Sequence, residues 1–280
     1  MSFLSSLMNA LPGAVAQGLA WGIMAIGVYI TFRILDVADL TVDGSLATGG
    51  AVCVMLIRAG VNPWLAMLCA LVSGMLAGLV TGLFHTRCGI PAILAGILTQ
   101  LALYSINLRI MGGKANQAVS VDKYHLLLSQ RYVRELSLDN PLPLLVVLTA
   151  VIVAALYWFF GTEKESSVRA TGANHHMARA QGINTSANIV LGLMLSNGLV
   201  ALSGALLAQY QGSSDINMGR GAIVYYIVLQ IVLQIGLNTN DLKLITALIV
   251  ALFLTLSYLN LKKTRRKPRR AAKKGVKQHA

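Results

Sequence analysis

Long apolar runs separated by shorter polar intervals make up most of the 280-residue chain. Backbone groups find no water inside a bilayer, so apolar runs of this length cross it as helices. The pattern predicts an all-α, polytopic transmembrane helix bundle with about seven to eight hydrophobic segments, one of which could be re-entrant; a crossing helix needs about 20 apolar residues. The predicted segments are 12–35, 44–57, 63–84, 91–111, 141–160, 185–209, 222–236 and 242–261.

Glycines recur every four residues in two of the predicted segments. Gly18 and Gly22 share one face of the first segment, and Gly74, Gly78 and Gly82 share one face of the third. Small residues at this spacing let transmembrane helices approach each other closely. We therefore expect both glycine faces to pack against neighbouring helices.

Polar residues interrupt the apolar pattern at 36–43, where three carboxylates occur. The apolar run that follows, 44–57, is too short to cross a bilayer unless the interruption itself enters the membrane. Two alternatives fit these residues. One is a loop at the membrane surface whose aspartates cap helices. The other is a broken helix that lines a path and faces protein or water.

The predicted segment 185–209 contains four polar side chains, namely Ser196, Asn197, Ser203 and Gln209. Such residues either bridge neighbouring helices or line a path, and bridging is the commoner role.

Long apolar runs, 141–160 and 185–209, flank a polar interval at 161–184. Its charged and amide side chains exclude it from lipid. Asn174 is a favoured helix N-cap, and Gly182 suits the end of a helix. Gly172 and Gly182 bracket residues 173–181, which are rich in helix formers. A short helix on one membrane face is predicted here, with an ordinary connecting loop as the alternative.

Three stretches together resemble ABC importer permeases of the branched-chain amino acid and ribose type. Residues 169–183 resemble the cytoplasmic loop that carries the coupling helix in that family. Residues 39–45 look like the break that follows its first helix, and 236–249 are similar to its putative tryptophan/tyrosine-type branch. The resemblance covers most of residues 10–261.

The resemblance implies a role for each of these stretches. The coupling helix would dock on a separate ATP-binding subunit, with contacts from Arg169, Gly172, Asn174, Arg179 and Gly182. The translocation path, as a weaker assignment, would include Asp39, Thr41, Asp43, Ser45 and Asn197.

The implied protein moves a small, amino-acid-like solute across the bacterial inner (plasma) membrane. An extracytoplasmic solute-binding protein would deliver that solute at the external loop, 112–140. Two permease copies, as a homodimer in the lipid bilayer, would enclose the path. ATP would be hydrolysed on the partner subunit, so this chain is expected to be no enzyme and to hold no cofactor or metal.

Composition changes this picture only at the two ends of the chain. The net charge of +13 comes mostly from ten Lys and Arg residues between 262 and 277. A basic tail at 262–280 is therefore expected on the cytoplasmic side, behind a permease domain at 1–261. The tail lacks the aromatic residues that stack on nucleic acid, so no nucleic-acid partner is expected.

At the other end, Pro12 suits a first helical turn and is expected to open the first span.

One departure from the family concerns the number of spans. If both the 161–184 loop and the basic tail are cytoplasmic, an even number of crossings must separate them, but the pattern gives three. The chain looks shortened by about one helix near Val224–Tyr225. A segment 222–236 that does not cross the membrane is the preferred solution, and a degenerate permease is an alternative.

Two other classes of protein are alternatives to the importer. An ion-coupled secondary transporter would use Asp39 or Asp43 as its proton or sodium site, because carboxylates within a membrane are costly and usually functional. A membrane enzyme or structural subunit has less support, since no paired catalytic groups converge. The chain lacks the Gly-x-x-x-x-Gly-Lys-Ser/Thr pattern that cradles phosphates.

Overall fold

The computed structural model describes residues 3–119, 124, 126–128 and 142–218, with side chains from residue 12 onward. The predicted segments 222–236 and 242–261, the basic tail, and the question of shortening near Val224–Tyr225 lie outside the described residues.

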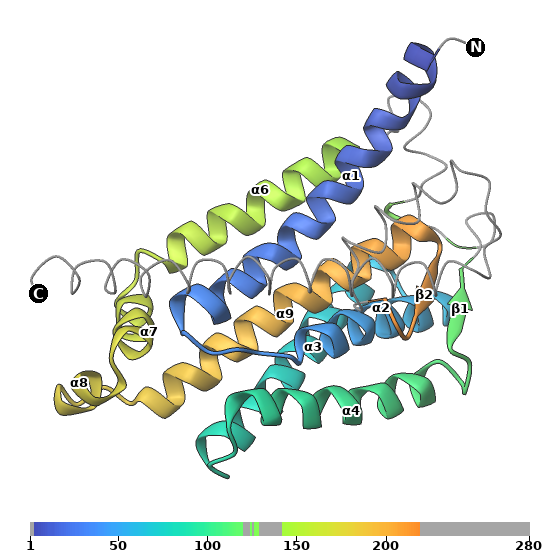
Figure 1. Cartoon of the computed structure of the whole chain (residues 1–280). Helices are drawn as coiled ribbons and strands as arrows, with labels where there is room; N and C mark the ends of the chain where they lie inside the picture. Colours follow the sequence, from blue (N-terminus) through green and yellow to red (C-terminus); the bar gives the residue numbers. More distant parts are fainter. Residues whose placement is uncertain (1–2, 120–123, 125, 129–141, 219–280) are drawn as a thin grey trace, which may run out of the picture. The chain divides into compact units, whose positions relative to one another are not determined.

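The described chain is mainly helical (Figure 1). Its elements are α1 (Phe3–Tyr29), η1 (Ile30–Ile34), α2 (Val42–Arg58), α3 (Pro63–Thr86), α4 (Ala92–Ile110), β1 (Asn116–Ala118), α6 (Leu142–Phe159), α7 (Glu163–Ala173), α8 (His175–Ala180), α9 (Thr185–Gln211) and β2 (Ser213–Asp215). Five helices are long and apolar enough to cross a membrane, namely α1 continued by η1, α3, α4, α6 and α9. The predicted helix bundle is confirmed.

Helix α9 runs through the centre of the bundle and packs against α1, α2 and α3 (Figure 1). Every side chain from Ser196 to Tyr210 is buried. α2 is also largely buried but has only 17 residues, a length of about 26 Å. It is therefore shorter than the roughly 30 Å hydrocarbon core of a bilayer.

The glycine face of α3 packs on α9 as predicted. A Cβ atom at Gly78 would collide with the carbonyl oxygen of Leu193, and one at Gly74 would collide with that of Asn197. Gly82 lies against Val190 in the same way. The hydrophobic effect contributes little to helix association within lipid. Close backbone packing of this kind therefore stabilises the contact between α3 and α9.

The corresponding prediction for the first segment finds no packing partner among the described residues. A Cβ at Gly18 or Gly22 would meet no atom within 4 Å in the described part of the chain. Gly27 takes the contact instead, with its Cβ position 2.9 Å from the carbonyl oxygen of Ser196. Spacing alone identifies a face of small residues but does not show which turn of that face meets a neighbour.

The first membrane-crossing stretch is Pro12–Ile34, so Pro12 opens the span as predicted, but it does not lie in a first helical turn because α1 begins at Phe3. Inside a helix a proline removes one backbone hydrogen bond and crowds the carbonyl four positions earlier, but transmembrane helices tolerate this because neighbouring groups and local adjustments satisfy the freed backbone group. A second unpredicted feature is the antiparallel pairing of β1 with β2, which places Gln117 opposite Ser214.

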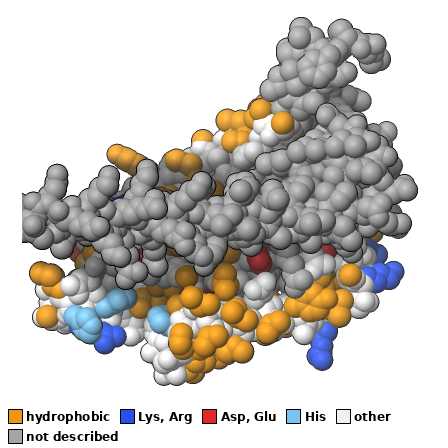
Figure 2. Space-filling model, viewed as in Figure 1, with side chains coloured by type: hydrophobic (Ala, Val, Ile, Leu, Met, Phe, Trp, Pro, Cys, Tyr) orange, Lys and Arg blue, Asp and Glu red, His pale blue; other side chains and the backbone are white. Residues whose placement is uncertain are grey.

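The outward faces of the crossing helices carry large apolar side chains. On the face seen in Figure 2, hydrophobic side chains occupy the middle of the described part, and basic side chains lie toward its ends. Tyr157 and Trp158, at the end of α6, are 83% and 76% exposed. Aromatic side chains of this kind gather at the membrane–water boundary, so this end of α6 is expected at that boundary, with α7 and α8 beyond it.

Candidate functional site

The first candidate site is built on a break between α1 and α2. α1 ends in the five-residue π-helix η1, closed by hydrogen bonds from Leu35 N to Ile30 O (3.1 Å) and from Val37 N to Thr31 O (3.0 Å). Residues 36–40 then run without helical structure to α2. Asp36 has a φ of +55°, a left-handed conformation that is uncommon outside glycine. The chain therefore leaves η1 and begins α2 after a short stretch without helical structure.

The polar side chains of this break converge on Asn197 in the middle of α9. Its amide Nδ2 donates to Asp39 Oδ2 at 2.6 Å and to the carbonyl oxygen of Leu193 at 3.0 Å. Its Oδ1 accepts a hydrogen bond from Ser45 Oγ at 2.6 Å. The other carboxylate oxygen of Asp39 accepts from the backbone N–H of Thr41 at 2.9 Å. One amide thus fixes both the break and the first turn of α2.

α3 adds a further hydroxyl to this group. The Oγ1 atoms of Thr41 and Thr81 are 2.8 Å apart, and both side chains are buried. Thr81 Oγ1 also bonds the carbonyl oxygen of Ala77 at 3.2 Å, in which it must be the donor. Thr41 is therefore the donor in the Thr41–Thr81 bond. We call Asp39, Thr41, Ser45, Thr81 and Asn197 the break cluster.

Four of the five predicted path residues belong to this cluster. The fifth, Asp43, lies half-buried in the first turn of α2, where a carboxylate favours the helix N-terminus. Thr81 was missed, and its position between Gly78 and Gly82 on the packed face of α3 is the signal that could have identified it. One side of the break packs against the bundle, where Leu35, Val37 and Thr41 are buried, while Asp36, Ala38 and Leu40 are exposed.

The second candidate site is the elbow formed by α7 and α8 at one end of the bundle (Figure 1). Asn174 Oδ1 accepts hydrogen bonds from the N–H groups of His176 (3.0 Å) and Met177 (3.1 Å), so Asn174 is the N-cap of α8 as predicted. Gly182, with a φ of +81°, turns the chain out of α8. The predicted short helix is confirmed, at His175–Ala180.

The two arginines of the elbow have partners within the chain. Arg169 lies on α7, is 66% exposed and pairs with Glu165 at 2.6 Å. Arg179 Nε donates to Thr185 Oγ1 at 2.8 Å, which ties α8 to the start of α9. The large exposed apolar side chain of α8 is Met177, at 61%, and sequence analysis did not single it out.

Gly172 does not bracket α8, contrary to the prediction. It lies inside α7, one residue before the end of that helix, and faces η1. A Cβ at this position would collide with the carbonyl oxygen of Ile34 and lie 3.0 Å from Leu35 Cα. Gly172 is thus a point of backbone contact between the elbow and the break.

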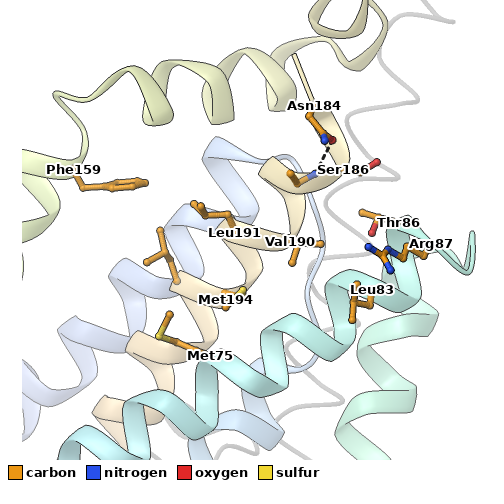
Figure 3. Close-up of a pocket in the computed structure, with 12 residues that line it drawn as sticks. Met75, Leu83, Thr86, Arg87, Phe159, Asn184, Ser186, Val190, Leu191 and Met194 are labelled. Carbon is orange, nitrogen blue, oxygen red and sulfur yellow. Dashed lines mark hydrogen bonds between the residues drawn. The ribbon is translucent and has the colours of Figure 1, made fainter. Parts of the chain in front are cut away.

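A cavity of 690 Å³ lies beside the N-terminal half of α9 (Figure 3). Its walls are mainly apolar and come from the end of α3, from Phe159 of α6 and from α9. Polar groups occur only near helix ends, where Arg87 follows α3 and the Asn184 side chain accepts a bond from Ala187 N at 3.1 Å. Because no group of polar side chains converges in it, the break cluster remains the stronger candidate site.

Comparison with known families decides the class of this protein. A family model described as the permease component of branched-chain amino acid transport systems matches residues 11–267. The chain belongs to this family of ABC-transporter permeases.

The relatives of this permease are named for different solutes. It is 36% identical to a tyrosine transport system permease of Clostridioides difficile, over 93% of this chain and 96% of the relative. It is 32% identical to an uncharacterized protein of Rickettsia prowazekii, over 89% and 98%. An autoinducer 2 import system permease of Yersinia pestis is 29% identical, over 83% and 64%. No solved structure matches this permease.

The alignment with the tyrosine permease contains gaps. It is 293 residues long and takes in 93% of this permease, about 260 of its 280 residues, so about 33 aligned positions (293 less 260) fall opposite gaps in this chain. A helix that crosses a bilayer needs about 20 residues, so these gaps are together long enough for one. The expected shortening near Val224–Tyr225 stays a prediction, since that position lies outside the described residues.

Proposed function

We propose that this permease is the membrane subunit of an ABC importer whose ATP-binding subunit docks on α8. The observation that carries the proposal is the short, capped helix α8, which lies just past the aromatic end of α6 and exposes Met177. A fixed helix with an exposed apolar side chain suits a groove on a partner protein. Asn174 and Gly182 set the ends of that helix, and Arg179 anchors it to α9.

The solute in this proposal is small and amino-acid-like. The relative named for tyrosine transport supports that class, and the two chains align over nearly their whole length. The break cluster would border the path, because broken helices place backbone and polar groups at the depth of the membrane. In the structure both carboxylate oxygens of Asp39 accept hydrogen bonds from the chain itself. This gives Asp39 a task in holding the break, which differs from the ion-binding task of a secondary transporter.

The proposed assembly holds further partners. A second copy of the permease would complete the path as a homodimer in the inner membrane, and an extracytoplasmic binding protein would deliver the solute. The basic tail would lie on the same, cytoplasmic side as α8.

The proposal is tested by affinity purification of the full chain from membranes, followed by uptake measurements in vesicles. An ATP-binding subunit should be recovered with the permease, and uptake should require ATP inside. Met177→Asp should reduce recovery of the ATP-binding subunit, whereas the matched change Asn116→Asp, on exposed β1, should not. Recovery of the permease without any ATP-binding subunit, together with uptake driven by an ion gradient, would contradict the proposal.

A further inference from the structure

We infer that α7 is a lever that carries motion of α8 to the break between α1 and α2. The contacts of Gly172 and Leu35 transmit this motion. The inference rests on the proposed docking of an ATP-binding subunit at α8. It adds the route by which displacement of that helix reaches the break cluster inside the bundle.

The first step of the route is the contact between Gly172 and η1. The missing side chain of Gly172 lets the backbone of α7 lie directly on the carbonyl group of Ile34. No side chain separates the two backbones at this point, so neither rotamer changes nor compressible packing can absorb a displacement. A shift of α7 toward η1 must therefore move the Ile34 peptide group.

The second step is the packing of Leu35, the residue after η1. Leu35 is fully buried and forms one apolar cluster with Val168 of α7 and with Leu193 of α9. Its Cδ1 atom lies 2.6 Å from the Cβ position of Gly192, so α9 closes the site from the other side. The residue that starts the break is thus enclosed between α7 and α9.

Polar contacts hold α7 to α9 over the same region. Asn188 Nδ2 donates to Ser167 Oγ at 2.7 Å and to Thr171 Oγ1 at 3.0 Å. The two hydroxyls lie one turn apart on α7, so one amide side chain spans that turn. These bonds fix the face that α7 turns toward the bundle and hold Gly172 against η1.

The chain between the Ile34 and Leu35 contacts and the break cluster is well suited to change shape. η1 has the wide i→i+5 bonding that is common at functional sites, and Asp36 has a left-handed backbone. The break lacks the repeated hydrogen bonds that stiffen a helix. Asp39, which is bonded to Asn197, lies only five positions after Ile34 in the chain. In the proposed lever, movement of the Ile34 peptide reaches the Asp39–Asn197 bond through this short stretch of chain.

The test compares Gly172→Ala with Gly161→Ala in the assembled complex. A Cβ at Gly172 meets backbone, so something must shift, whereas a Cβ at Gly161 lies at an ordinary 3.4 Å from Trp158 O. Gly172→Ala should lower the ratio of solute taken up to ATP hydrolysed by about ten-fold, the scale seen for residues along a coupling route. Gly161→Ala should leave that ratio unchanged. An unchanged ratio in Gly172→Ala complexes would overturn the lever.

A second measurement does not depend on how well Gly172→Ala folds. Spin labels are placed in a cysteine-free complex at Lys164 on α7, at Arg33 on η1 and at Arg87 beyond α3, all of which are exposed. Between the nucleotide-free and ATP-bound states, the Lys164–Arg33 separation should stay constant. The Arg33–Arg87 separation should change by about 2 Å or more, the scale of helix shifts in switching proteins. A Lys164–Arg33 change with a constant Arg33–Arg87 separation would overturn the lever, while docking of the ATP-binding subunit would still stand.

Discussion

Asn197 donates its side-chain amide to Asp39 at 2.6 Å across 158 residues of sequence. The donor lies in the central helix of the bundle, and the acceptor lies in the break between α1 and α2. Because Asn197 also accepts from Ser45, its two amide atoms serve two different parts of the chain. This arrangement gives the first prediction.

Replacement of Asn197 by leucine should destabilise the permease by about 1–3 kcal/mol for each buried polar group left without a partner. Asp39 would lose one donor and Ser45 its acceptor. The neighbouring Ser196 provides a matched control, because its buried Oγ has no hydrogen-bond partner within the described part of the chain. Ser196→Ala should be neutral or slightly stabilising. Thermal unfolding in detergent measures both variants, and equal melting temperatures would refute the proposed role of Asn197.

Gly78→Ala should weaken the bundle, because the added methyl group would collide with the backbone of α9 at Leu193. Inserting a carbon into a well-packed contact typically costs about 1–3 kcal/mol. Gly18→Ala tests the opposite case, since nothing described lies within 4 Å of its Cβ position. There the change should gain up to about 1 kcal/mol, from the better helix propensity of alanine. Comparable losses at both positions would show that the two glycine faces do not differ in packing.

The left-handed backbone of Asp36 predicts that glycine is tolerated better than valine at that position. Asp36→Gly should preserve or raise stability, since glycine adopts this conformation freely. Asp36→Val should cost roughly 1–2 kcal/mol, because a β-branched residue is strained there. The melting temperatures of the two variants decide the matter, and a more stable valine variant would rule out the described break.

Two N-cap variants distinguish an effect on helix stability from an effect on docking of the ATP-binding subunit. Asn174→Ala removes the N-cap of α8, and Asn62→Ala removes the N-cap of α3, where Asn62 Oδ1 accepts from Trp64 N at 3.0 Å. Each change should cost about 0.5–2 kcal/mol of helix stability. Only Asn174→Ala should weaken binding of the ATP-binding subunit, measured as the affinity of the purified permease for it. Equal affinity in the two variants would argue against docking on α8.

Helix positions were predictable where apolar length and end signals agree. α3 begins at Pro63 behind the N-cap Asn62, and α9 begins at Thr185 behind Asn184. Both starts lie where the apolar runs begin. α8 was predictable because Asn174 and Gly182 are local signals whose effect does not depend on the rest of the fold.

The features that the sequence did not reveal depend on contacts between distant residues. Gly172 has the local appearance of a helix stop, yet its neighbour is Ile34, far away in the sequence. In the same way, the pairing of β1 with β2 joins Asn116 to Asp215, and nothing in either short strand indicates its partner.

The most direct test of the account is photo-crosslinking from position 177 in the full chain in intact membranes, with position 116 as the control. Met177 is exposed on α8, and Asn116 is exposed on β1. The account predicts an adduct between position 177 and an ATP-binding subunit that strengthens when ATP is bound, with no such adduct from position 116. If position 177 instead reacts with a membrane-impermeant reagent added outside the cell, or forms no adduct in an assembled complex, the account is contradicted.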